Sequence, residues 1–298
     1  MLISKIGEFG LIERFRKQIK TDATVIKGSG DDCAVLKLDR FNYQLFTCDM
    51  IIEGVDFTLK SDPCLIGRKA IAISISDIAS CGGIPRHCVI SLGIPGNTKV
   101  KFTDKLFKGM RDIAKAYKIN IVGGDLSRAE KVTLDVAMLG VVEKKNLALR
   151  SHAKAGDIIL VTGALGGSIS GKHLRFAPRL KEARMLVKNF NARAMIDISD
   201  GLIQDLSHIL KQSRVGARIY EELIPVSRQA RGLDDALYSG EDFELLFTLT
   251  RQDAKNLFRK NIRGFKAIGE IVDEAYGLKL IDKNNREKRI KSKGYRHF

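Results

Sequence analysis

The feature that constrains this chain most is the segment 197–202, Asp-Ile-Ser-Asp-Gly-Leu, in which two aspartates stand three residues apart. It follows the apolar run 194–196, and apolar residues recur at helical spacing over residues 202–210. The pattern predicts a strand, an acidic turn and a helix. Carboxylates at the end of a strand are well placed to meet a cation that holds a phosphate. Because Asp also caps helices well, Asp200 taken alone is explained equally by a capping role.

The same arrangement recurs, since nearly all of six aspartates follow an apolar run and lie near a glycine. They are Asp32, Asp49, Asp77, Asp125, Asp197 and Asp200. Capping and turn formation explain each one separately, but they do not explain the shared placement. If the turns converge, they form a site of hard oxygen ligands without an evident histidine or cysteine ligand, which suits Mg²⁺ better than Zn²⁺. Without the ion, mutual repulsion would raise the pKa of some of these carboxyl groups.

The chemistry of such a site narrows the possible functions. Magnesium held by carboxylates usually binds phosphates, so the residues predict a nucleotide-using enzyme that transfers or hydrolyses a phosphoryl group.

One segment resembles a different nucleotide site, because residues 166–172 fit the P-loop pattern GxxxxGK after an expected strand at 157–162. His173, however, stands where a Ser or Thr hydroxyl would bind magnesium. A true P-loop is therefore not expected, which leaves phosphate binding or close helix packing as roles for the glycines.

Composition argues against two classes of protein. No apolar run approaches the ~20 residues of a membrane span, and the first residues lack the apolar core of a signal peptide. The chain has 51 Lys and Arg against 35 Asp and Glu, a net charge of +16. These charges are scattered, and the densest cluster, residues 286–293, has no aromatic residues that would stack on bases. We therefore expect a solvated basic surface that attracts anionic substrates, with no membrane partner and no specific nucleic acid.

The cysteines indicate the redox compartment. They are Cys33, Cys48, Cys64, Cys81 and Cys88, all in the first third of the chain. Their number is odd and no two form a CxxC pair, so neither a disulfide framework nor a zinc site is expected. Reduced thiols of this kind predict a cytoplasmic protein.

The apolar patterning predicts an α+β fold of two α/β domains. Helices and strands alternate, but hairpin-like strand pairs favour mixed sheets over a purely parallel one. Asp62 and Pro63 mark the start of a helix that continues to about Ser80, and an amphipathic helix is expected over residues 7–20. The polar, irregular segment 144–152 separates the two halves. We place the domain boundary between residues 145 and 146.

The ordered motifs of the chain resemble those of the thiamine-monophosphate kinase family, within the superfamily that includes aminoimidazole ribonucleotide synthetase and selenophosphate synthetase. Residues 7–12 read GEFGLI and residues 293–298 read KGYRHF, and these two segments point to this family within the superfamily. The other matching segments are 30–34, 49–57, 69–70, 76–79, 123–125, 150, 156–157, 197–202 and 240–246. They follow the family order from end to end.

The resemblance implies which residues form the site. The magnesium ligands carried over by position are Asp32, Thr47, Cys48, Asp49, Asp77, Asp125, Asp197 and Asp200, with the backbone oxygen available at Cys48. The nucleotide contacts are Gly124, Asp125, Arg150 and Ser199. The contacts to the phosphorylated substrate are Asp56, Glu241 and Ser292. Asp56 stands where many members have His, and Ser292 stands where an aromatic residue often lies.

The resemblance also implies ATP-dependent phosphorylation of thiamine monophosphate to thiamine diphosphate, with Mg²⁺, by a homodimer. Residues 1–145 would bind ATP and Mg²⁺ and dimerise through strands, and residues 146–298 would form a mixed α/β domain. The acceptor is already a phosphate with a second pKa of about 6, so no general base and no catalytic side chain is predicted. Mg²⁺ and Arg150 would offset the repulsion between two anions, about 4 kcal/mol for unit charges ~4 Å apart at an effective dielectric of about 20.

Two alternatives stay open from the sequence. Another ATP-using reaction of the superfamily, such as amidine ring closure or selenophosphate synthesis, would use the same fold. Selenophosphate synthesis would favour a reactive cysteine in an N-terminal glycine-rich loop, whereas Cys33 is interpreted as a packing residue. A basic nucleic-acid-binding protein would instead show salt-sensitive RNA binding without ATP turnover.

Overall fold

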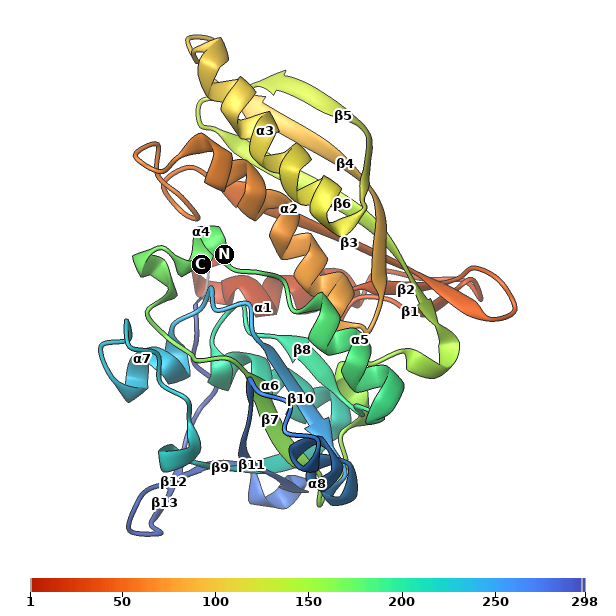
Figure 1. Ribbon diagram of the computed structural model, residues 1–298, viewed down its shortest axis with the longest axis vertical. Helices are drawn as coiled ribbons and strands as arrows, with labels where there is room; N and C mark the ends of the chain where they lie inside the picture. The colour runs from red at the N-terminus through yellow and green to blue at the C-terminus, as the bar shows by residue number, and fades with distance from the viewer. Residues whose placement is uncertain (1, 296, 298) are drawn as a thin grey trace.

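Two mixed β-sheets, one above the other in Figure 1, organise the chain. The computed structural model describes residues 2–295 and 297. Within these residues, six strands form the first sheet in the order β1-β2-β3-β6-β4-β5, and seven form the second in the order β13-β12-β9-β11-β7-β10-β8. Helices accompany both sheets, which confirms the predicted α+β fold class.

The first sheet has one covered face and one open face. Its strands are β1 (Val25–Lys27), β2 (Ala34–Lys37), β3 (Asn42–Ile52), β4 (Ile84–Ile94), β5 (Asn120–Arg128) and β6 (Thr133–Glu143). Only β4 and β5 pair parallel; the other pairs are antiparallel. Helices α2 (Pro63–Ser80) and α3 (Val100–Tyr117) lie over one face, where Leu45 and Ile51 of β3 are buried. Phe46 and Met50, which alternate with them, are exposed on the other face.

Helix α2 joins the two sheets. It begins as predicted, because the Asp62 side chain accepts a hydrogen bond from Cys64 N at 3.1 Å and Pro63 occupies the first turn. Most residues from Ile66 to Ser80 are buried. The helix packs against β3 and β6 on one side and against α5 (Leu180–Asn189) and β8 (Met195–Asp197) on the other. Polar groups on α2 therefore lie where the two sheets meet.

The second sheet carries helices on both faces. Its strands are β7 (Ile158–Thr162), β8, β9 (Val215–Tyr220), β10 (Leu245–Leu249), β11 (Phe265–Asp273), β12 (Leu278–Ile281) and β13 (Glu287–Arg289). Helices α6 (Leu202–Ser213) and α7 (Leu233–Tyr238) share one apolar core with the sheet, and α5 and α8 (Arg251–Arg259) share another. Along β7, Ile159 and Val161 belong to the first core and Leu160 to the second. This alternation is expected of a strand buried on both sides.

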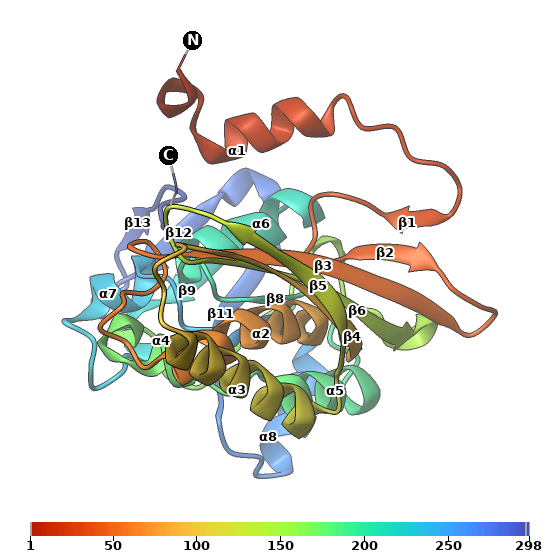
Figure 2. The ribbon, with the colours of Figure 1, turned by 90° about the horizontal axis from the view of Figure 1, so that it is seen from above.

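The N-terminal helix differs from its prediction. Helix α1 spans Ile3–Arg16 and is kinked at Gly7, which has a φ of 70°. None of its described residues is buried, and Figure 2 shows the helix lying apart from the sheets. It reaches α6 through a ring contact between Phe9 and His208. The apolar stripe of this helix is therefore largely exposed, with Phe15 at 55%.

The junction between the sheets contains two short 3-10 turns, η1 (Lys144–Asn146) and η2 (Arg150–His152). The predicted division into domains between residues 145 and 146 stays a prediction.

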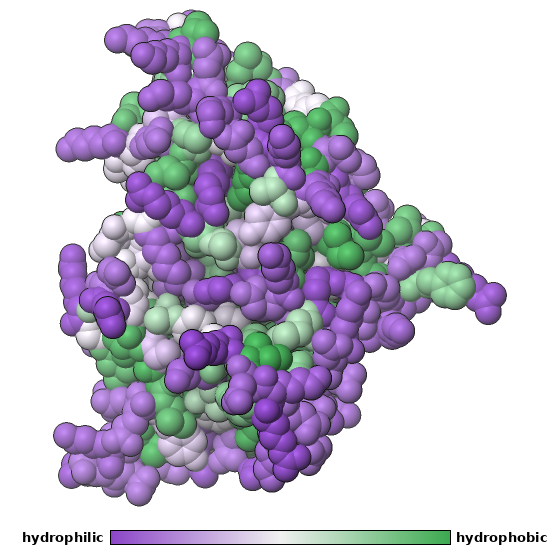
Figure 3. All heavy atoms as spheres, viewed as in Figure 1, coloured by the Kyte–Doolittle hydropathy of each residue, from purple (hydrophilic) through white to green (hydrophobic). Residues whose placement is uncertain are grey.

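Among the described residues, no helix is both long and apolar enough to cross a membrane. Figure 3 shows hydrophilic side chains spread over the visible face, with apolar side chains between them.

Candidate active site

Hydroxyl groups hold the carboxylates that the sequence identifies as metal ligands. The hydrogen bonds from α2 join Ser74 to Asp49 (2.8 Å), Ser76 to Asp197 (2.5 Å) and Ser80 to Asp32 (2.5 Å). On β3, the Thr47 hydroxyl donates to Asp77 Oδ2 at 2.5 Å. Hydroxyls orient a carboxylate without neutralising it. The arrangement therefore positions four negative groups and leaves their charge uncompensated by these hydrogen bonds.

Three of these carboxylates form a cluster at the junction of the sheets. One oxygen from each of Asp32, Asp77 and Asp197 lies within 4.8 Å of the other two. Burial raises the pKa of Asp197 to about 8, and the charge of Asp32 adds to this effect. Burial also raises the pKa of Asp49 to about 6 and holds that of Asp77 well above its usual range. Such oxygens take up a proton or a cation, and the donor set fits a hard divalent cation such as Mg²⁺.

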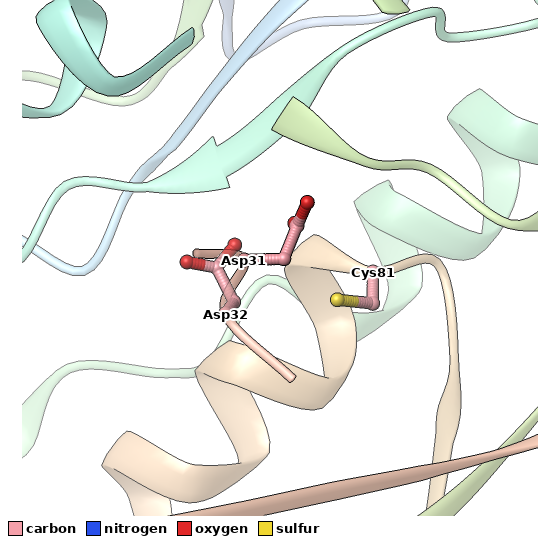
Figure 4. Close-up of side chains that lie close together, drawn as sticks. All are labelled: Asp31, Asp32 and Cys81. Carbon is pink, nitrogen blue, oxygen red and sulfur yellow. The ribbon is translucent and has the colours of Figure 1, made fainter. Parts of the chain in front are cut away.

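Asp31 and Arg150 form the edge of this cluster. Figure 4 shows Asp31 and Asp32 beside Cys81, which follows the last turn of α2. Burial, together with the charge of Asp32, raises the pKa of Asp31 to about 7. The Arg150 side chain pairs with Asp32, and its backbone N–H lies 3.3 Å from Asp31 Oδ1. Arg150 Nε is buried without an acceptor among the described residues.

The turn after β8 has the predicted form but a different cap. The N-cap residue of α6 is Gly201, with a φ of 119°. A Cβ there would lie 2.9 Å from the carbonyl oxygen of Tyr238, so the turn requires glycine. The backbone N–H groups of Asp200 and Gly201 each donate to Asp205 Oδ2 at 3.1 Å. Since Asp205 caps the turn, helix capping does not explain Asp200.

A cavity of about 410 Å³ adjoins the carboxylates. Asp49, Ser199 and Asp200 line one part of it. Its lining also includes Asp56, Lys69, Ile169, His173, Glu241 and Tyr295. The sequence-predicted substrate contacts Asp56 and Glu241 are thus in the same cavity as three predicted metal or nucleotide contacts.

Internal contacts fix the polar groups of this cavity. The buried Lys69 pairs with Glu241 and donates to the Asp56 carbonyl oxygen at 3.0 Å. The Asp56 carboxylate accepts from Ile52 N at 2.7 Å. Glu241 and Phe243 have φ values of 68° and 50°, a region that non-glycine residues rarely adopt. Strain of this kind is concentrated at functional sites, and here it places the loop against the 198–200 turn.

Two predicted contacts lie on the edge strand of the first sheet. Gly124 and Asp125 belong to β5, and β6 and β4 separate it from β3. At ~4.8 Å per strand, Asp125 is about 14 Å from Asp49. The register places Asp125 level with Met50, which puts both on the open face. One chain therefore does not bring Gly124 and Asp125 to the carboxylate cluster.

Cys48 and Ser292 also lie outside the cluster and the cavity. The Cys48 side chain is exposed on the open face of β3, between the inward-facing Thr47 and Asp49. Ser292 Oγ donates to Gln204 Oε1 at 2.7 Å and does not line the cavity. Tyr295 of the same closing segment does line it, and its N–H donates to the Asp200 carbonyl at 3.0 Å. Arg296 and Phe298 of the closing motif lie outside the described residues.

The segment that imitates a P-loop has a structural role. Lys172, at the start of α4 (Lys172–Arg175), donates to Glu244 at 2.8 Å and to the Ala164 carbonyl at 3.1 Å. A Cβ on Gly167 would lie 2.4 Å from the backbone of Gln229. The lysine is therefore held by the chain itself, and the glycine allows close packing, as expected from the departure at His173.

The chain matches two sequence models, AIR synthase related protein, N-terminal domain, over residues 30–142 and AIR synthase related protein, C-terminal domain, over residues 154–280. Thiamine-monophosphate kinase of Buchnera aphidicola subsp. Schizaphis graminum is 35% identical, with 98% of this chain and 99% of that protein covered. The chain belongs to the thiamine-monophosphate kinase family. The Bacillus subtilis (strain 168) member of the family is 33% identical, with 98% and 100% covered.

A solved structure of the family has the same fold. The structure described as AaThiL complexed with AMPPCP and TMP superposes with a TM-score of 0.88 and 29% identity, covering 100% of this chain and 99% of that one. Together with the full-length identity of the kinases above, this confirms the family predicted from the ordered motifs.

Sequence reasoning missed several residues that build the site. They are Asp31, Ser74, Ser76, Ser80, His173, Asp205 and Tyr295. One signal was present, because serines at 74, 76 and 80 interrupt the apolar pattern that begins at Ala70. Buried hydroxyls in such a helix need acceptors, and nearby carboxylates supply them. The other residues are brought together by tertiary packing between distant segments.

Proposed function

We propose that this chain transfers a phosphoryl group from ATP to the phosphate of thiamine monophosphate, which forms thiamine diphosphate. The observation that carries the proposal is the carboxylate cluster that adjoins the 410 Å³ cavity, with Asp49 and Asp200 at their boundary. Full-length identity to thiamine-monophosphate kinases supports the substrate, as does the neighbouring structure that contains AMPPCP, an ATP analogue, and TMP.

Magnesium is part of this proposal. The buried, hydroxyl-held carboxylates with raised pKa values fit a divalent cation, which Asp32, Asp49, Asp77, Asp197 and Asp200 would hold. When bound there, Mg²⁺ would neutralise the charge of the phosphates. Thr47 contributes by orienting Asp77, and the backbone oxygen of Cys48 stays a proposed ligand.

The side chains of the chain supply binding and orientation. Arg150, which pairs with Asp32 at the edge of the cluster, would contact a nucleotide phosphate, and Ser199 lines the cavity beside Asp200. Glu241 and Asp56 place negative charge where a cationic thiazolium ring would bind. The acceptor phosphate is largely ionised at neutral pH, so transfer needs no general base. Alignment of the two anions is then the main catalytic contribution of the protein.

A homodimer is proposed from the open face of the first sheet. Phe46, Met50 and Val89 are 43%, 55% and 40% exposed, and the register puts all three on that face. A second copy that covers this face would approach β5 and give Gly124 and Asp125 a route to a nucleotide contact. We expect a dimer at micromolar concentration in light scattering, and Met50→Glu should shift it toward the monomer. A wild-type monomer at that concentration would contradict this part of the proposal.

A cytoplasmic location is inferred from the cysteines. All five thiols are free, and Cys33, Cys81 and Cys88 are buried, as expected for a protein of a reducing compartment.

The test is ADP release in the presence of Mg²⁺ with three acceptors: thiamine monophosphate, free thiamine and an aminoimidazole ribonucleotide precursor. Turnover is expected with thiamine monophosphate alone. Free thiamine should fail because its hydroxyl would have to lose a proton during transfer, whereas the acceptor phosphate is already ionised. Asp77→Asn is the control for contaminating kinases. Comparable turnover of thiamine, or turnover of the ribonucleotide precursor alone, would contradict the proposal.

A further inference from the structure

The cavity has a wall that comes from the glycine-rich segment of the second half. Ile169 lies on the turn η3 (Ser168–Ser170), His173 lies on α4, and both line the cavity. The segment is anchored, because Gly167 packs against the backbone of Gln229 and Lys172 is held by Glu244. Ile169 nevertheless remains 73% exposed. An anchored segment therefore presents an uncovered apolar side chain and an imidazole to the same cavity.

The protonation pattern of the His173 ring follows from its neighbour. Its Nδ1 lies 2.9 Å from the carbonyl oxygen of Ser168. A carbonyl oxygen accepts and cannot donate, so Nδ1 carries the hydrogen. In the neutral ring, Nε2 then has a lone pair and acts as an acceptor. No hydrogen bond to Nε2 is present among the described residues.

Two carboxylates of this cavity already have a partner within the chain. The Asp56 carboxylate accepts from Ile52 N, and Glu241 is paired with Lys69. The phosphate of the substrate must lie beside Asp49, Ser199 and Asp200, because those residues adjoin the carboxylate cluster. The remainder of the substrate extends from there into the cavity. We place its distal ring against Ile169 and His173, which line the same cavity.

We propose that His173 is a specificity-determining residue, which accepts at Nε2 a hydrogen bond from the exocyclic amine of the aminopyrimidine ring, while Ile169 packs on the face of that ring. This inference rests on the proposed function. An aminopyrimidine combines an N–H donor with two apolar faces, and the pair His173 and Ile169 complements both features. Sites that hydrogen-bond a polar group of a substrate discriminate strongly against analogues that lack it.

The first experiment compares His173→Asn with His173→Gln. The Asn side chain retains a donor near the position of Nδ1 for the Ser168 carbonyl but has no group at Nε2. The Gln side chain places a carboxamide near the position of Nε2. We expect His173→Asn to raise the KM for thiamine monophosphate about tenfold, the effect of one lost hydrogen bond, with kcat and the KM for ATP within about twofold. His173→Gln should have a KM for thiamine monophosphate between those of the wild type and His173→Asn. If His173 acted only through its contact with Ser168, His173→Asn would instead have the lower KM of the two variants, since Asn preserves that contact.

The second experiment uses oxythiamine monophosphate, in which a carbonyl oxygen replaces the exocyclic amine. The wild type should prefer thiamine monophosphate by about tenfold or more in kcat/KM, and His173→Asn should reduce this preference to about twofold. Ile169→Ser, a change at an exposed position, should raise both KM values and leave the preference unchanged. An unchanged preference in His173→Asn would overturn the inference while leaving the proposed function intact. A wild type that phosphorylates neither compound would instead overturn the proposed function, and this inference with it.

Discussion

Two buried acidic clusters in this chain differ in how their charge is compensated. In the second sheet, Glu244 lies between Arg179, with contacts of 2.6 and 2.9 Å, and Lys172 at 2.8 Å. Burial acts to raise the pKa of Glu244, but these two cations hold it below its usual range. At the junction of the sheets, the partners of Asp49, Asp77 and Asp197 are hydroxyls, and the pKa values of all three are raised.

The difference separates a structural cluster from a binding cluster. The chain itself completes the Glu244 cluster, so its carboxylate contributes stability once the protein folds. Asp49, Asp77 and Asp197 are oriented by hydroxyls and have no ion pair among the described residues, although Asp32 beside them pairs with Arg150, so these three cost stability until a cation arrives. Asp242 is intermediate, because burial raises its pKa although Lys172 lies 3.6 Å away. The same chemical change, carboxylate to amide, should therefore have opposite effects on stability in the two clusters.

The largest expected effect is on activity, in Asp197→Asn. Removing this carboxylate should lower kcat/KM about 10³-fold, or ~4 kcal/mol, as expected for the loss of a group that stabilises transition-state charge. The melting temperature in EDTA should stay the same or rise, because the cluster loses a self-repelling charge. Steady-state kinetics over a Mg²⁺ titration and thermal melting measure both effects. Activity near that of the wild type at low Mg²⁺ would rule out the role of Asp197 as a ligand.

The matched change in the other cluster is Glu244→Gln. It leaves Lys172 and Arg179 without their anion, and we expect a loss of about 2 kcal/mol, less than for a fully buried pair because both cations are about one-third exposed. For a chain of this size the melting temperature should fall by about 6 °C. Activity per folded molecule should remain within about threefold. A melting temperature equal to that of the wild type would remove the distinction between the clusters.

The pH dependence of metal-free stability tests the aspartate cluster without a mutation. The folded-state pKa values of Asp49, Asp31 and Asp197 are raised to about 6, 7 and 8. Raised values mean that the folded state binds protons more tightly, so this stability is present at low pH and is lost as pH rises through those values. In EDTA, the melting temperature should fall by several degrees between about pH 5.5 and 8.

Magnesium should oppose that loss. The increase in melting temperature that Mg²⁺ causes should grow with pH, because the ion replaces the protons that the carboxylates release. Melting curves with and without Mg²⁺ at three pH values suffice for the measurement. The Asp197→Asn variant is the control, and its curve in EDTA should be flatter. A wild-type melting temperature that rises with pH in EDTA would contradict the raised pKa values.

Features with a local cause could be predicted from the sequence. Helix α2 starts at Pro63 because Asp62 and Pro63 form a cap within two residues, and that signal does not depend on the rest of the fold. Asp197 and Asp200 were identified because a strand end, a glycine and a helical pattern are contiguous. Helices α5 and α7 were missed, and neither has a side-chain cap at its N-terminus.

Features with a tertiary cause could not be predicted. The left-handed conformations of Glu241 and Phe243 occur at non-glycine residues and depend on hydrogen bonds to Ser199 and Ile198. His173 was noticed only as the residue that breaks the P-loop pattern, whereas the fold places it in the wall of the cavity. The predicted contacts Gly124 and Asp125 illustrate the converse, because a sequence motif does not reveal that they lie three strands from Asp49.

The smallest expected effect is that of Ser76→Ala, which asks whether the hydroxyls of the aspartate cluster only orient their partners. Ser76 is buried and donates to Asp197 at 2.5 Å. Its hydrogen bond favours the charged form of Asp197, so its removal should raise the pKa of that carboxyl group further. In EDTA at low pH the protonated carboxyl needs no donor, and the free energy of unfolding should fall by no more than about 1 kcal/mol.

With Mg²⁺, the Asp197 carboxylate of Ser76→Ala should be less well oriented. The half-saturating Mg²⁺ concentration should therefore rise about threefold, while kcat at saturation changes little. Ser74→Ala should act in the same way through Asp49, at 2.8 Å. A loss of kcat that saturating Mg²⁺ does not restore would show that Ser76 acts on the reacting phosphates directly. The hydroxyls of the aspartate cluster would then do more than orient carboxylates for a metal ion.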